Sequence, residues 1–232
     1  MRFVSFLLLF CACDEAGTGG RAVELNVEVR PVQPGVMTLA DDEVTLTRAE
    51  LELTAVYVID QPPPSVSLLR RLLDLGIPAA HAHAGHDFFA GGQVLTEWIH
   101  PVTVDLLQSA ITLGRVPGIA GEARSASVLL WPRGGRSLFV EGVVTRSGRS
   151  SPFFVSVSLD GAPETQRVDF TYAEGALDDD VTLVVEPSVA AWFSGAVFTD
   201  ADVGELSPHS QVARALQLNL RRHTAWRVRA VR

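Results

Sequence analysis

Hydrophobic and polar residues alternate with a period of two along much of this chain. Residues 22–30 place apolar side chains at odd positions and polar ones at even positions. Residues 43–60 alternate in the same way and become continuously apolar after Thr54. Side chains two positions apart share one face of a strand. The pattern therefore predicts a strand with one buried face at 22–30, and a strand at 43–60 whose second part lies inside a sheet.

Segments of the same kind follow at short spacing, and the hairpin at 137–161 carries a polar, glycine-containing turn between its strands. The other predicted strands are 93–99, 101–108, 123–132, 166–174, 179–187 and 224–232. About nine or ten short strands with turn signals between them are typical of an all-β protein. We therefore expect an antiparallel β-sandwich with one C-terminal helix. Residues 22–232 form one domain in this prediction, because no linker follows residue 21.

The C-terminal helix is predicted at 207–223, where apolar residues spaced by four share one face. Ser207 is the expected N-cap, and Pro208 the expected first helical residue. Two shorter helical segments are expected at 66–76 and at 188–193.

The N-terminus has the features of a secretion signal. An apolar run of eight residues begins at Phe3, and it is too short to span a bilayer, which needs about 20 residues. The stretch "LFCAC" that follows resembles a bacterial lipobox. Cys13 matches the lipidated position better than Cys11, because a small residue precedes Cys13. Alternatives are an ordinary cleaved signal and a buried N-terminal strand.

The lipobox interpretation divides the N-terminus into a signal peptide at 1–12 and a tether at 13–21. The predicted partner is a membrane, reached through the lipid, and the predicted location is the periplasm or the outer cell surface. Cys11 and Cys13 are the only cysteines. If Cys13 becomes the lipidated N-terminus, the domain has no disulfide and no thiolate metal site.

Composition narrows the function further. The net charge of −8 argues against nucleic acid as a partner, since such binding depends on clustered positive charge. All 19 basic residues are arginine. Nucleophile-elbow, H-E-x-x-H, phosphate-loop and dinucleotide motifs are missing from the sequence, so we do not expect an enzyme.

The stretch "PAAHAHAGHDFFAGG" at 78–92 is the one segment that indicates chemistry. His81 and His83 would point to the same side of an extended backbone, and His86 with Asp87 could turn back across a glycine. Imidazole and carboxylate ligands suit Zn(II) or Cu(II). We therefore predict a copper or zinc site at these four residues, with His100 as an optional further ligand.

Other interpretations remain open. The histidine segment is rich in alanine, glycine and proline, so it could be a solvated loop. The chain would then be a structural or interaction lipoprotein that binds a protein or a glycan. A zinc hydrolase, with Glu97 as the nearby base, is a third possibility. The aspartates in 177–181 lack the spacing of an EF-hand and are more typical of a solvated turn.

The secretion signal, the all-β pattern, "VDLL" at 104–107 and "AAWFSGAVF" at 190–198 together resemble the methanobactin-associated MbnP-like group of periplasmic proteins. That group is associated with copper, so the resemblance favours copper as the metal. It assigns no role to any residue of this chain.

Overall fold

In the computed structural model, residues 20–63, 93–160, 166–199 and 202–232 are described, and β-structure dominates them. Fourteen strands lie in these ranges: β1 (Ala22–Val29), β2 (Val36–Leu39), β3 (Asp42–Ile59), β4 (Val94–Asp105), β5 (Ile111–Ile119), β6 (Gly121–Glu122), β7 (Ser125–Leu129), β8 (Leu138–Arg146), β9 (Arg149–Val157), β10 (Arg167–Thr171), β11 (Ala176–Leu177), β12 (Thr182–Pro187), β13 (Gly204–Glu205) and β14 (Trp226–Val231). Two α-helices, α3 (Val189–Trp192) and α4 (Gln211–Leu220), precede a short 3₁₀ helix, η1 (His223–Ala225). Within the same ranges, no helix is long and apolar enough to cross a membrane.

Twelve of the strands form one mixed sheet. Its main path runs in the order β13-β9-β8-β3-β4-β5-β1-β12-β14, while β2 and β7 also pair with β3, and β10 pairs with β7. The short strands β6 and β11 pair with each other.

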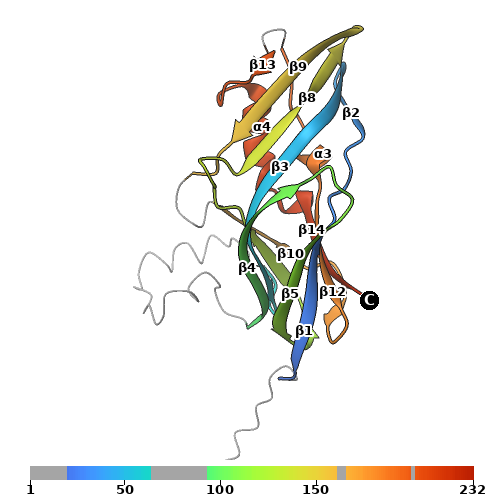
Figure 1. The fold of residues 1–232 in the computed structure, drawn as a ribbon, viewed down its shortest axis with the longest axis vertical. Helices are drawn as coiled ribbons and strands as arrows, with labels where there is room; N and C mark the ends of the chain where they lie inside the picture. Colours follow the sequence, from blue (N-terminus) through green and yellow to red (C-terminus); the bar gives the residue numbers. More distant parts are fainter. Residues whose placement is uncertain (1–19, 64–92, 161–165, 200–201) are drawn as a thin grey trace, which may run out of the picture.

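The long strand β3 connects the two parts of the molecule seen in Figure 1. Its first half pairs with β8 and β2 in the upper part, and its second half pairs with β4 and β7 in the lower part. Helices α3 and α4 pack beside the upper strands (Figure 1). Asn219 of α4 is buried and donates to the carbonyl oxygens of Trp192 and Ser194, at 2.9 and 2.7 Å, which fixes α4 to the end of α3.

The lower part of the sheet curls until its two ends meet. The amide of Ala173, just after β10, donates to Val228 O of β14 at 2.9 Å, and the amide of Ala230 donates to Glu174 O at 3.0 Å. The curled sheet therefore surrounds a core. Apolar side chains from many of its strands fill this core, Leu25 among them.

The predicted β-class is confirmed, and the predicted antiparallel arrangement holds for most strand pairs but not for all of them. Strand β1 runs parallel to β12, and β13 runs parallel to β9. The alternation of residues decides which face of a strand is buried and leaves the direction of its neighbour open. The described ranges also contain more than the nine or ten strands predicted, because β2, β5 and the two-residue strands lie outside the predicted segments. Strand β5 contains Gly114, Pro117 and Gly118, which weaken its strand pattern.

The predicted hairpin at 137–161 is confirmed as β8 and β9. Ser147 and Gly148 form its two-residue turn with φ angles of +49° and +77°, as a type I′ turn requires. Within β8, a Cβ atom on Gly142 would lie 2.3 Å from Thr45 O, so this position requires glycine.

Two predicted boundaries are corrected. The segments 93–99 and 101–108 form a single strand, β4, with an irregularity near Pro101. Helix α4 begins later than predicted, and its N-cap is Ser210, whose Oγ accepts from the amide of Ala213 at 3.1 Å. Pro208 therefore lies in the turn before the helix. The predicted helical turn at 188–193 is confirmed as α3, and the predicted helix at 66–76 lies outside the described residues.

Candidate functional site

His100 is the one predicted metal ligand that the structure describes. It is exposed on β4, and its ring meets that of Trp98 edge-on, with 5.8 Å between the ring centroids. The β3–β4 register shifts here, since Leu53 pairs with Val102 whereas Ala55 pairs with Ile99. One residue of β3 thus faces two residues of β4, which is a β-bulge. The bulge accommodates Pro101, which has no amide hydrogen for the ladder.

The residues around His100 have mainly structural roles. Trp98 belongs to the core with 3% exposure, and its Nε1 donates to Leu113 O at 3.4 Å. Glu97 is exposed opposite Tyr57 of β3. Burial raises the pKa of the Tyr57 hydroxyl, and the charge of Glu97 raises it further.

The other predicted ligands, His81, His83, His86 and Asp87, lie outside the described residues, as does Cys13. What the structure describes is the base of the segment that carries the histidines. The amide of Gln93 donates to Asp60 Oδ1 at 2.8 Å, and the amide of Asp60 donates to Gln93 O at 3.2 Å. We call this reciprocal pair the loop base. It holds the two ends of the 61–92 segment together at the end of the β3–β4 hairpin.

The distance from the loop base to His100 limits which ligands can share one ion. Seven residues separate Gln93 from His100 along β4, which corresponds to about 23 Å. Seven residues also separate His86 from Gln93, and a fully extended chain of that length reaches about 25 Å. Because each imidazole reaches several ångströms from its own Cα, His100 and His86 can share an ion only if the chain between His86 and Gln93 folds back along part of β4. A site made of the loop residues alone carries no such requirement.

Elsewhere in the described ranges, no three His, Cys, Asp or Glu residues come together as a set of metal ligands. The aspartates of the 177–181 turn lie beside arginines. Asp178 forms ion pairs with Arg21 and Arg232, and Asp179 with Arg21. Hydrogen bonding from the Asp179 amide and the nearby arginines lower the pKa of Asp178. These contacts agree with a surface turn held by ion pairs.

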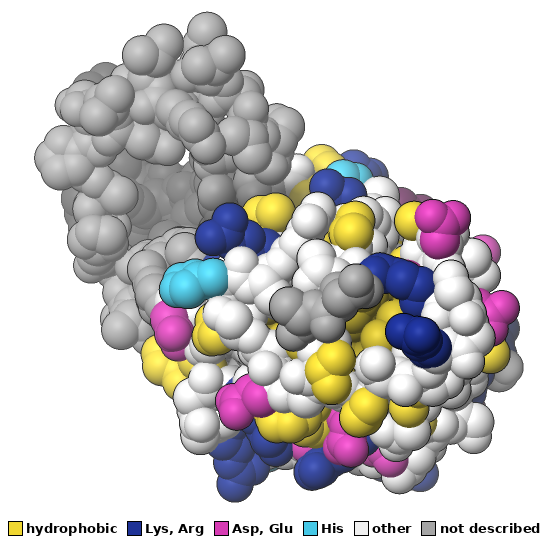
Figure 2. Space-filling model, turned by 90° about the horizontal axis from the view of Figure 1, so that it is seen from above, with side chains coloured by type: hydrophobic (Ala, Val, Ile, Leu, Met, Phe, Trp, Pro, Cys, Tyr) yellow, Lys and Arg dark blue, Asp and Glu magenta, His cyan; other side chains and the backbone are white. Residues whose placement is uncertain are grey.

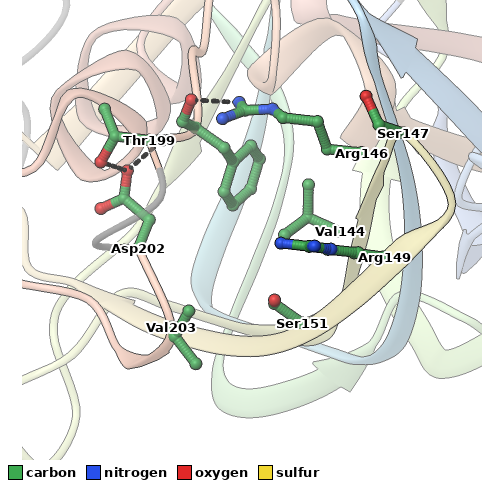
Figure 3. A pocket seen from close by; sticks show the side chains of 9 residues that line it. Val144, Arg146, Ser147, Arg149, Ser151, Thr199, Asp202 and Val203 are labelled. Atoms are coloured by element: carbon green, nitrogen blue, oxygen red, sulfur yellow. Dashed lines mark hydrogen bonds between the residues drawn. The ribbon is translucent and has the colours of Figure 1, made fainter.

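No pattern in the sequence predicted a groove that lies at the other end of the molecule. It has a volume of about 570 Å³ and lies between the β8–β9 turn and the described residues 198–199 and 202–203 (Figure 3). One wall carries the polar, glycine-containing turn of the predicted hairpin. The two walls are some fifty residues apart in the chain, so no local pattern could have indicated the groove. Seen from above, the surface mixes basic, acidic and apolar side chains (Figure 2).

Comparison with protein-family models, with characterised proteins and with solved structures finds no match for this chain. The resemblance to copper-associated periplasmic proteins and the lipobox assignment therefore stay predictions from the sequence.

Proposed function

We propose that this protein is a lipid-anchored protein of the cell envelope that binds copper or zinc through His81, His83 and His86. Asp87 is the fourth ligand in this proposal, and His100 an optional one. The observation that supports it best is the loop base. Three histidines within six positions lie in a segment whose two ends are joined at one point of the β3–β4 hairpin, which lowers the entropic cost of closing a site.

The chemistry of the ligands gives the proposal a pH dependence. Neutral imidazole binds the metal, and protonation removes the lone pair that forms the bond. With an ordinary histidine pKa near 6.5, metal should be released as the pH falls below about 6.

The sheet supports an orientation for the proposed site. Register pairs connect Val23 to Gly118, Gly118 to Thr96 and Thr96 to Val58. The start of β1 and the loop base therefore lie at the same end of the sheet. A tether at 13–21 would leave from this end, so the histidine segment would face the membrane that holds the lipid.

The metal proposal predicts one Cu(II) or Zn(II) per chain, measured by titration calorimetry at neutral pH on a chain that starts after Cys13. Metal should raise the melting temperature, since a ligand that prefers the folded state stabilises it. The variant His81→Ala/His83→Ala/His86→Ala should lose both effects. The variant His209→Ala/His223→Ala is the matched control, because both residues are exposed, and it should bind normally. His100→Ala should have a small effect.

Equal binding by wild type and the triple variant would remove the proposed site. So would the failure of either metal to bind more tightly than about 100 μM, which corresponds to about −5.5 kcal/mol.

Lipidation is tested separately. Radiolabelled palmitate should label the wild-type protein and the Cys11→Ser variant, and labelling should vanish in Cys13→Ser. Unchanged labelling of Cys13→Ser would contradict the assignment of Cys13.

A second candidate is a lipoprotein that binds a protein or a glycan, with the histidines incidental. A groove beside the β8–β9 turn, at the opposite end of β3 from the loop base, favours a binding role that does not use the histidines. For the fold, we propose that the curled sheet is a β-sandwich in which the β1–β12 and β13–β9 pairs depart from antiparallel order.

A further inference from the structure

The groove between the β8–β9 turn and residues 198–199 and 202–203 has the size and lining of a small-molecule site. Its volume of about 570 Å³ falls within the roughly 300–1,000 Å³ usual for ligand pockets. Val144 and Phe198, both buried, contribute apolar surface, and Val203 contributes an exposed apolar side chain. The ring of Phe198 is fixed by an edge-on contact with Phe153, whose centroid is 4.8 Å away.

Two arginines on one wall differ in how their charges are compensated. Arg146 and Arg149 are direct cross-strand partners at the end of the hairpin, where like charges destabilise the pair. Arg146 donates to both carboxylate oxygens of Asp42, at 2.6 and 2.7 Å, and to Phe198 O at 2.5 Å. Arg149 has no hydrogen bond or ion pair with any residue that the structure describes. Its guanidinium points into the groove (Figure 3).

Asp202 supplies an uncompensated negative charge on the opposite wall. Its Oδ2 accepts from the amide of Thr199 at 2.7 Å and from Thr199 Oγ1 at 2.9 Å. Both donors are neutral, and among the described residues no cation lies within ion-pair distance of this carboxylate. The two bonds to Thr199 fix the carboxylate and leave Oδ1 available. Figure 3 shows Asp202 and Arg149 on different sides of the same space.

We propose that this groove binds a small zwitterion, namely an α-amino acid with an aliphatic or aromatic side chain. The ligand carboxylate would accept from Arg149, and its ammonium group would donate to Asp202. Its side chain would pack on Val144, Phe198 and Val203. A ligand with only a carboxylate would leave Asp202 unpaired beside it, and one with only an amine would leave Arg149 unpaired.

This site is independent of the metal proposal. Seventeen residues of β3 separate Asp42, beside the groove, from Ile59, next to the loop base, which is about 55 Å of strand. Neither site therefore needs the other to be correct.

The test begins with thermal melts of the full chain in each of the twenty standard amino acids at about 10 mM and neutral pH. At least one amino acid with an apolar side chain should raise the melting temperature. Titration calorimetry then compares that amino acid with its N-acetyl derivative, which lacks the ammonium charge, and with its decarboxylated amine. Both derivatives should bind at least about tenfold more weakly.

Variants test the two charges. Arg149→Gln and Asp202→Asn should each weaken binding at least about tenfold, and asparagine can still accept from Thr199. Arg214→Gln, an exposed arginine on α4, is the matched control and should bind as wild type does. The proposal fails if no amino acid shifts the melt, if the N-acetyl derivative binds equally well, or if Arg149→Gln and Asp202→Asn keep wild-type affinity.

Discussion

Arg146 and Arg149 are the same residue type at directly opposite positions of β8 and β9, and they have different roles. Asp42, the ion-pair partner of Arg146, is only 3% exposed. Its buried carboxylate therefore needs the arginine to compensate its negative charge. Arg149 is exposed, and its charge adds repulsion without a compensating contact in the described structure. The difference follows from position. One residue ends β8 above a buried aspartate, and the other begins β9 at the rim of a groove.

Arg146→Ala should lower the free energy of unfolding by about 2–4 kcal/mol, because it leaves the buried Asp42 carboxylate without its partner. Arg149→Ala should change the free energy of unfolding by less than about 0.5 kcal/mol. Urea unfolding of both variants measures this contrast. Equal losses would mean that Arg149 has a structural role the contacts do not reveal.

The start of helix α4 illustrates how elements are positioned. Ser207, Pro208 and Ser210 all suit a helix start, and the chain uses the last of them. Ser207 Oγ instead accepts from the amide of His209 at 3.2 Å, which stabilises the turn before the helix. The packing of Val212 and Leu216 into the core decides which turn becomes helical.

Ser210→Ala should destabilise the protein by about 1 kcal/mol, since it removes the N-cap acceptor for the Ala213 amide. Ser207→Ala is the matched comparison and should cost less than half as much. Thermal or urea unfolding distinguishes the two serines. A larger loss of unfolding free energy in Ser207→Ala would mean that Ser207, the N-cap predicted from the sequence, caps the helix.

At the scale of the whole molecule, the chain contains no lysine, so tyrosines are the side chains whose ordinary pKa lies near 10. Its only two tyrosines are Tyr57 and Tyr172. Burial raises the pKa of both hydroxyls, and more strongly that of Tyr172, where the backbone of Ala230 offsets only part of the effect. The folded state therefore holds these two protons more tightly than the unfolded state does.

The free energy of unfolding should accordingly be unaffected by the tyrosines below pH 10 and should fall as the pH rises above 10. Above that value the unfolded chain ionises its tyrosines, whose ordinary pKa is about 10, while the folded chain does not. Urea unfolding between pH 8 and 11 measures the decline. Tyr172→Phe and Tyr57→Phe should each reduce the decline, because burial raises the pKa of both hydroxyls. A decline that is identical in Tyr172→Phe would contradict the assignment.

Much of the fold could be predicted because the signals are local. The alternation at 22–30 and 43–60 gave two strands with the correct buried faces, and the turn chemistry around Gly148 identified the β8–β9 hairpin. Of the candidate site, the sequence supplied the residues, whereas the structure describes only the loop base and His100. Whether the three loop histidines bind a metal stays a prediction that the titration must test.

By itself, the sequence determined that this is a β-rich chain with an apolar core, because period-two patterns, prolines and turn residues act within a few positions. Only the tertiary structure decided the parallel pairing of β1 with β12, the curling that joins β14 to the end of β10, and the groove between Arg149 and Asp202. Each of these joins residues about fifty or more positions apart. Such contacts depend on how whole strands pack against one another, and no single stretch of sequence encodes that.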